Sequence, residues 1–143
     1  MIYLSSLSKV ITASLNGAEG EIINVELHLT NGFPCLNIVG LPDITVRESK
    51  ERVRSAIIMA GFKFPNKRMT VNLYPGNVRK GGTHFDLPIA VGILAAKYEI
   101  SSENLKNIAI FGELSLNGEV KKIRGALPLT LCAIENKFKT CNT

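Results

Sequence analysis

Apolar and polar side chains alternate along two segments of the chain, and this alternation predicts two half-buried strands. In residues 23–29 the odd positions are Ile, Val or Leu, and the even positions are Asn, Glu or His. In residues 68–75, RMTVNLYP, the side chains of Met69, Val71 and Leu73 share one face in the same way. A period of two places one set of side chains in a core and the other in solvent. Residues 1–17 carry a single lysine and no continuous apolar block, so we interpret them as a strand rather than a secretion signal.

Two turn sequences predict hairpins. NGFP at 31–34 separates the alternating segment 20–30 from CLNIVG at 35–40, which is expected to return beside it as a second strand. NIAIFGELSLNGEVKKI at 107–123 predicts two strands joined at Asn117–Gly118, a dipeptide typical of tight hairpin turns.

Three segments have the spacing of apolar residues that is typical of helices. The first extends from Asp43, a candidate N-cap, to about Ala60, and Gly61 is expected to end it. The second covers about 87–97 and the third about 127–136. The predicted buried stripes are Val46, Val53, Ile57 and Ala60 on the first helix and Leu87, Ala90, Val91 and Leu94 on the second.

The order of these elements indicates a mixed α/β chain of the α+β class rather than a doubly wound parallel sheet. A further strand is expected after the last helix, but residues 137–143 show no pattern typical of one. We therefore predict a single domain over residues 1–143 and expect it to be a fragment of a longer protein.

Composition narrows the classes of function. Apolar residues make up 45% of the chain, which is enough for a proper core. No apolar run approaches the roughly 18 residues of a membrane-spanning helix, so no membrane partner is expected. The three cysteines form no CxxC pair, and His28 and His84 lie far from any cysteine pair. This pattern predicts no metal site and a reducing, cytoplasmic location.

Positive charge is concentrated in the second part of the chain. Residues 1–60 carry five Lys or Arg against six Asp or Glu, whereas residues 61–143 carry twelve against six. The formal net charge of +5 therefore comes from residues 61–143. A basic face that contacts nucleic acid and an ordinary solvated surface are both compatible with this distribution.

The segment KGGTHFDLPIAVGILAA, residues 80–96, joins a glycine-rich turn to a predicted helix. It lacks the GxxxxGK[ST] string of a phosphate-binding loop, and Asp86 would repel a phosphate from the helix start. Thr83, His84 and Asp86 are too close in sequence to form a catalytic triad, whose members usually come from separate elements. We therefore predict a structural role, in which Asp86 caps the helix and Pro88 occupies its first turn.

Three long blocks resemble the N-terminal domain of the ComM/YifB family, which is also described as magnesium-chelatase-like or competence-related ATPases. The blocks are VGLPDITVRESKERVRSAI, GFKFPNKRMTVNLYPGNVRKGGTHFDLPIAVGILAA and FGELSLNGEVKKIRGALPL. The resemblance implies a Lon-protease-like, two-layer domain related in fold to domain 2 of a small-subunit ribosomal protein. It also implies that an AAA+ ATPase module follows, which would bind ATP and Mg. For ComM-type members it implies a hexameric helicase that promotes DNA branch migration during natural transformation.

Lon-type proteases use a serine–lysine dyad, and the resemblance implies where each member would fall in this chain. The serine position corresponds to Asp86 or a neighbour, and the lysine position falls near Leu127, so neither residue type is present. A shifted alignment would nominate Thr83 with Lys121 or Lys122. The lysine is essential to such a site because its amine accepts the hydroxyl proton of the nucleophile.

The leading hypothesis is a non-catalytic domain that binds no cofactor itself and packs against its own AAA+ module, neighbouring ring subunits or DNA. A degenerate Lon-like Ser/Thr-Lys hydrolase is the alternative, and a separate RNA- or DNA-binding module is a third, based on fold analogy alone. In a Lon-like fold, the basic residues after the strand 68–75 and those after Asn117–Gly118 are expected to converge around the vacated groove. The candidate contacts to DNA or a neighbouring subunit are Lys63, Lys67, Arg68, Arg79, Lys80, Lys121, Lys122 and Arg124.

Overall fold

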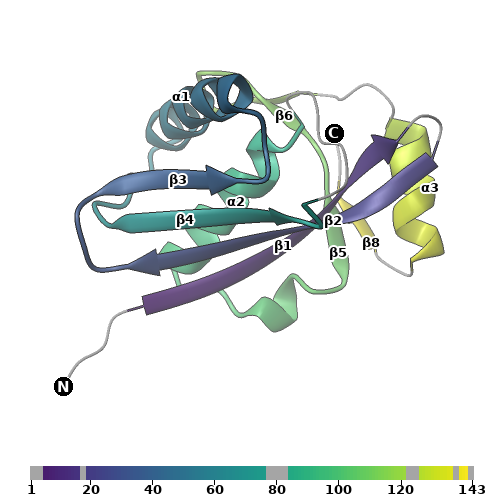
Figure 1. Ribbon diagram of the computed structural model, residues 1–143, viewed down its shortest axis with the longest axis horizontal. Helices are drawn as coiled ribbons and strands as arrows, with labels where there is room; N and C mark the ends of the chain where they lie inside the picture. The colour runs from purple at the N-terminus through teal and green to yellow at the C-terminus, as the bar shows by residue number, and fades with distance from the viewer. Residues whose placement is uncertain (1–4, 17–18, 77–83, 122–125, 137–138, 142–143) are drawn as a thin grey trace.

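A mixed six-stranded sheet with helices packed on it forms the domain (Figure 1). The computed structural model describes residues 5–16, 19–76, 84–121, 126–136 and 139–141. The mixed α/β class predicted from the sequence is confirmed. The elements in chain order are β1 (Ser5–Asn16), β2 (Glu19–Thr30), β3 (Cys35–Val39), α1 (Asp43–Met59), β4 (Arg68–Tyr74), α2 (Asp86–Lys97), the 3₁₀ turn η1 (Ser102–Asn104), β5 (Ile108–Ile110), β6 (Glu113–Leu114), β7 (Val120–Lys121), α3 (Ala126–Glu135) and β8 (Lys139–Cys141).

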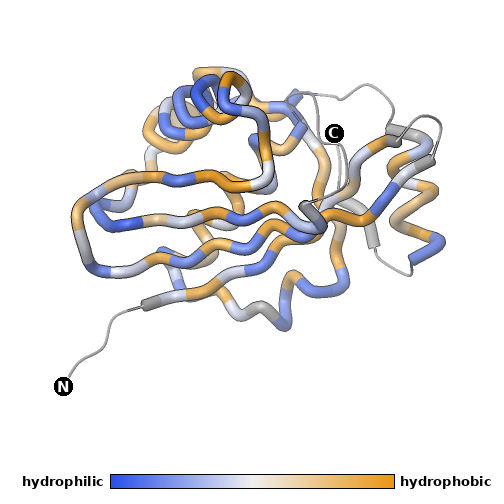
Figure 2. The backbone as a smooth tube through the Cα atoms, viewed as in Figure 1, coloured by the Kyte–Doolittle hydropathy of each residue, from blue (hydrophilic) through white to orange (hydrophobic). Residues whose placement is uncertain are grey.

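The strand order in the large sheet is β3-β4-β2-β1-β5-β8. β1 and β2 form a long antiparallel hairpin in which Val10 lies opposite Val25. β2 pairs with β4 in antiparallel fashion, while β3 pairs with β4 in parallel. The strands predicted at the N-terminus, at 20–30 and at 68–75 are confirmed, and Figure 2 shows the alternation of hydrophobic and hydrophilic residues along them.

The predicted hairpin between segments 20–30 and 35–40 is wrong, because β4 lies between β2 and β3. The reason is that α1 follows β3 directly and buries Val53 and Ile57 against the sheet. After such a crossover helix, the chain returns as a strand parallel to the one it left. β4 therefore takes the place beside β3.

The two faces of the sheet are covered differently. Val10, Val25 and Leu27 face the core that contains α1 and α2. Ile11 and Ala13 point the opposite way and pack with Leu129 and Ala133 of α3. The sheet is therefore covered on one face along most of its length, and α3 covers the other face near the β1–β2 turn.

The helices lie close to their predicted ranges, with differences at their ends and faces. α1 begins at Asp43, but Pro42 is its N-cap and no side chain provides a cap hydrogen bond. Ala60 is exposed because the helix has ended at Met59, and Gly61 follows with a φ of +96°. The predicted buried stripe of α2 is only partly correct: Ala90 is buried, but Leu87, Val91 and Leu94 are half-buried, and Ile89, Ile93 and Ala96 form the face that is inaccessible to solvent.

The second predicted hairpin forms as β6 and β7, with Leu114 opposite Val120. Gly118 has a φ of +89°, and the backbone N–H of Glu119 donates to Asn117 Oδ1 at 3.1 Å. The preceding apolar residues instead form β5 in the large sheet, parallel to β1.

The strand that we expected but did not find after the last helix is present. β8 pairs in parallel with β5, and Ile110 lies opposite Cys141. Its three residues are too few for a period-two pattern to be recognised in the sequence.

Candidate functional site

The start of α2 lies deep in the domain, against the middle of α1. Asp86 is the first residue of α2 and only 1% of its surface is exposed. The prediction that Asp86 is the N-cap is wrong: Phe85 occupies that position, and no side chain makes a cap hydrogen bond. Phe85 and Asp86 are adjacent. Because Asp86 lies one position further along the helix than the N-cap, its carboxylate contacts α1 rather than the free N–H groups of its own helix.

Two side chains of α1 bind the Asp86 carboxylate. Ser49 Oγ donates a hydrogen bond to Oδ1 at 2.7 Å, and Arg52 Nε donates to Oδ2. Arg52 also contacts the exposed Glu48 through Nη1, at 3.5 Å from Oε2. The hydrogen bond with Asp86 is the main cause of the raised pKa of Arg52, and burial opposes it. We call Ser49, Arg52 and Asp86 the α1–α2 bridge.

The α1–α2 bridge satisfies a carboxylate that would otherwise be buried alone. A buried charge costs several kcal/mol without partners, so the bridge constrains how α1 can sit on α2. Neither Arg52 nor Ser49 belongs to the apolar stripe that the sequence predicts for this helix. The available signal was spacing, because Ser49 falls in line with the apolar residues Val46 and Val53.

His84 lies beside the bridge, with its ring centroid 4.3 Å from that of Phe85. Its Nε2 is buried and has no hydrogen-bond partner among the described residues. Burial lowers the pKa of His84, while a hydrogen bond with the backbone of Ala13 and the nearby charges of Glu113 and Asp86 act in the opposite direction. The imidazole is therefore held preferentially in its neutral form.

The basic residues that we predicted as contacts, as far as the structure describes them, lie in two separate regions. Lys67 and Arg68 lie at the start of β4, and Lys67 Nζ donates to Asn31 Oδ1 at 2.7 Å. Lys121 lies on β7 in the small hairpin, and the preceding residue, Val120, lines the same pocket as Leu87 of α2. Exposed Lys63 precedes β4, and its carbonyl accepts a hydrogen bond from Lys97. Arg79, Lys80, Lys122 and Arg124 lie outside the described residues, so their predicted convergence stays a prediction.

Of the residues in the alternative Thr–Lys dyad, the structure describes Lys121. Thr83 and Lys122 lie outside the described residues. Lys121 is exposed, and its Nζ pairs with Glu119 Oε2 at 2.6 Å, an interaction that lowers the pKa of Glu119. A catalytic lysine must instead lose its proton to act as a base, which burial promotes and an adjacent carboxylate opposes.

Neither a metal site nor a membrane span is found in the part of the chain that the structure describes. No three of its His, Cys, Asp and Glu side chains group together as metal ligands. No described helix is both long enough and apolar enough to cross a bilayer.

Comparison with known proteins identifies one family. The family model described as subunit ChlI of Mg-chelatase matches residues 25–141. The chain is 43% identical over 132 residues to competence protein ComM of Haemophilus influenzae, covering 92% of this chain and 26% of that protein. It is 44% identical over 122 residues to the uncharacterized protein YifB of Salmonella typhimurium, covering 85% of this chain and 24% of that protein. The chain thus spans about a quarter of the length of these relatives.

A more distant relative is Lon protease 2 of Bacillus subtilis. It is 34% identical over 91 residues, which is 64% of this chain and 16% of that protein. This similarity fits the mixed sheet and helices described above.

Replacing Asp86 by Ala should destabilise the domain substantially. The substitution leaves the Ser49 hydroxyl and the Arg52 guanidinium without their buried partner, and we expect a loss of about 2–4 kcal/mol in the free energy of unfolding. Urea denaturation measures this loss. Glu48→Ala is the matched control, because it removes an exposed carboxylate from the same arginine and should change stability by less than about 0.5 kcal/mol. Equal losses of unfolding free energy in the two variants would show that the α1–α2 bridge does not stabilise the domain more than an exposed ion pair does.

The stability of the domain should fall as the pH drops through the ordinary titration range of histidine. The pKa of His84 is lowered in the folded state, so the unfolded chain binds more protons between the folded pKa and about 6.5. The free energy of unfolding therefore rises with pH across this window, and the contribution of His84 is fully lost once the pH is below the folded pKa. Urea denaturation between pH 7.5 and pH 5 should show a shallower dependence in His84→Gln than in His28→Gln, which alters the other histidine. An unchanged slope in His84→Gln would contradict this account.

Proposed function

Because the chain belongs to the ChlI family of magnesium-chelatase-like proteins, together with ComM and YifB, we propose that it is the N-terminal, non-catalytic domain of a cytoplasmic AAA+ ATPase. In this proposal the domain acts in ring assembly, in DNA contact or in both. The process would be DNA branch migration during natural transformation, which is the role that the ComM resemblance suggests.

The α1–α2 bridge is the observation that carries the non-catalytic assignment. The Lon resemblance implies that the position of the nucleophilic serine corresponds to Asp86 or a neighbour, and a carboxylate has no hydroxyl to activate. Both oxygens of Asp86 already accept hydrogen bonds from α1. Ser49 carries the nearby hydroxyl, and it is fully buried and donates to Asp86. This arrangement supports a helix start whose polar groups maintain structure.

The ATP and Mg of this family would bind in the AAA+ module that we propose to follow residue 143. A phosphate-binding loop needs GxxxxGK[ST], and this string does not occur in the 143 residues. A reading frame that encodes the string after Thr143 would therefore support the proposed domain order, and a stop codon there would contradict it.

The β6–β7 hairpin is the surface that we propose for DNA or a neighbouring subunit. The side chain of Lys121 is 56% exposed, and the sequence continues with Lys122 and Arg124. The carboxylate of Glu119 pairs with the first of these three positive charges, that of Lys121. Three cations within four residues of sequence, the first of them exposed, are well suited to phosphate groups or to an acidic patch on another subunit.

The test uses the full-length protein with Lys121, Lys122 and Arg124 replaced by Ala. We expect DNA affinity to fall by at least about tenfold, and the slope of log affinity against log salt to decrease by up to about three units, because up to three phosphate contacts are lost. Fluorescence anisotropy measures DNA binding, and sedimentation measures ring assembly, which we expect to persist.

The control is the charge-matched triple variant of Lys9, Arg47 and Lys106 to Ala, which removes three exposed cations from other elements. Loss of assembly rather than of DNA binding would assign the hairpin to the subunit contact. If neither property changes, the hairpin is a solvated surface and its assignment is wrong.

A further inference from the structure

β3 is an edge strand, and one side of its backbone faces away from the sheet (Figure 1). It pairs only with β4, and the Cys35 N–H donates to the Lys67 carbonyl at 3.3 Å. Along a strand, the N–H and C=O groups of successive residues point alternately to its two sides. Because those of Cys35 point toward β4, those of Leu36 and Ile38 point outward, toward the free edge. Such an edge can accept another extended chain by strand addition.

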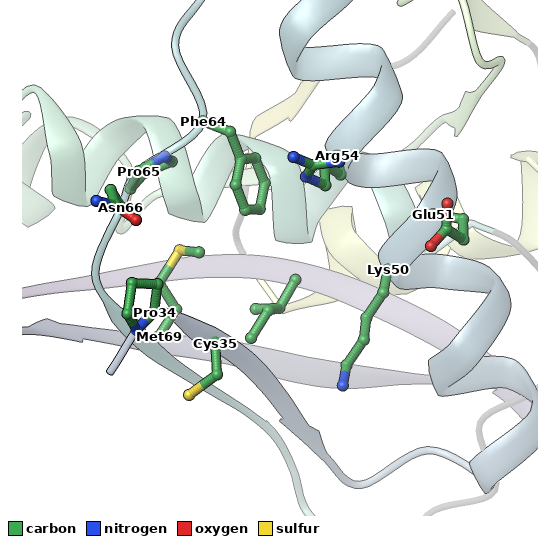
Figure 3. Close-up of a pocket in the computed structure, with 10 residues that line it drawn as sticks. Pro34, Cys35, Lys50, Glu51, Arg54, Phe64, Pro65, Asn66 and Met69 are labelled. Carbon is green, nitrogen blue, oxygen red and sulfur yellow. The ribbon is translucent and has the colours of Figure 1, made fainter. Parts of the chain in front are cut away.

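A cavity of about 400 Å³ lies directly beside this edge, between β3, α1 and the segment that leads into β4 (Figure 3). Its walls are mixed, with apolar residues from β3, β4 and the segment before β4 and charged residues from α1. Leu36 of β3 and Phe64 both line it. The apolar and proline residues that line it are Pro34, Leu36, Phe64, Pro65 and Met69.

The α1 wall of the cavity carries two cations, Lys50 and Arg54, and one carboxylate, Glu51. Lys50 extends from α1 toward β3, and Arg54 extends toward Phe64, with the guanidinium 5.8 Å from the ring centroid (Figure 3). Across the described ranges, neither cation has a carboxylate within ion-pair distance, although Glu51 lies on the same helix. Like charges four residues apart on a helix repel each other. An anion in the cavity would relieve this repulsion.

We propose that this cavity and the edge of β3 together bind an extended, acidic peptide segment of a protein partner. The segment adds to β3 as a further strand through Leu36 and Ile38. Its side chains on the α1 face follow the pattern apolar–x–acidic, so that one contacts the apolar lining of the cavity and the next on that face reaches Lys50 or Arg54. A period of two places both on the same face of the added strand.

A peptide explains more of this site than a nucleic acid does. DNA phosphate would satisfy Lys50 and Arg54, but it would use neither the apolar lining nor the outward main-chain groups of β3. An extended peptide uses all three features at once. The site is also distinct from the β6–β7 hairpin, so it can be tested separately from the proposed function.

The experiment titrates the isotopically labelled 143-residue chain with the peptide Ser-Leu-Thr-Asp-Thr-Glu-Ser and follows backbone amides by NMR. We expect saturable shifts of the Leu36 and Ile38 amides at millimolar peptide or below. The double variant Lys50→Ala/Arg54→Ala should raise Kd by about tenfold or more, because charge-assisted hydrogen bonds are lost. Lys9→Ala/Lys106→Ala removes the same charge elsewhere and should leave Kd unchanged.

Two N-methylated forms of the peptide test strand addition itself. Methyl groups on alternate nitrogens block one edge of an extended peptide and leave the other free. One of the two forms should lose binding and the other should retain it. Equal binding of both forms, or an absence of shifts at Leu36 and Ile38, would overturn the proposal. So would a short DNA duplex that binds at Lys50 and Arg54 while the peptide does not bind.

Discussion

The buried carboxylate of Asp86 holds the two helices of the main core in register. With 1% of its surface exposed, it needs partners, and Ser49 and Arg52 of α1 supply them. Once α1 is fixed in this way, Val53 and Ile57 face the sheet and Lys50 and Arg54 face the cavity beside β3. The far end of α1 then supports the β6–β7 hairpin, because a Cβ on Gly118 would lie 3.0 Å from the Ala56 carbonyl oxygen. Both proposed interaction surfaces thus include, or pack against, the helix whose position the α1–α2 bridge constrains.

The same contact bears on function. In a Lon-type protease, the start of the corresponding helix presents a nucleophile to a substrate. Here, the start of α2 carries an inward-facing carboxylate that fixes α2 against α1. Arg52 balances the charge of this carboxylate within the domain. His84 stays preferentially neutral beside it because burial disfavours the charged imidazolium. We therefore interpret the domain as a Lon-like scaffold whose exposed hairpin and sheet edge, rather than its helix start, meet other molecules.

Local patterns predicted most of the elements but not their neighbours. Alternation at Met69, Val71 and Leu73 identified β4, and all three side chains are buried. The position of β4 between β2 and β3 could not be predicted from alternation, because strand order depends on where α1 directs the chain. β8 was missed because three residues carry too little pattern. The role of Asp86 was mistaken because an N-cap and a first helical residue differ by one position, and burial is not visible in a sequence. Ser49, in line with the apolar stripe of α1, was the signal that could have revealed the α1–α2 bridge.

The central claim is that this domain has no Lon-type hydrolytic activity. The most direct measurement is hydrolysis of fluorogenic peptides by the purified chain, alongside its Thr83→Ala and Lys122→Ala variants. Our account predicts no turnover above the protein-free rate in any of the three, because a nucleophile needs a base whose amine can accept its proton. Turnover by the unmodified chain that either substitution abolishes would contradict the account and identify a working Thr–Lys dyad.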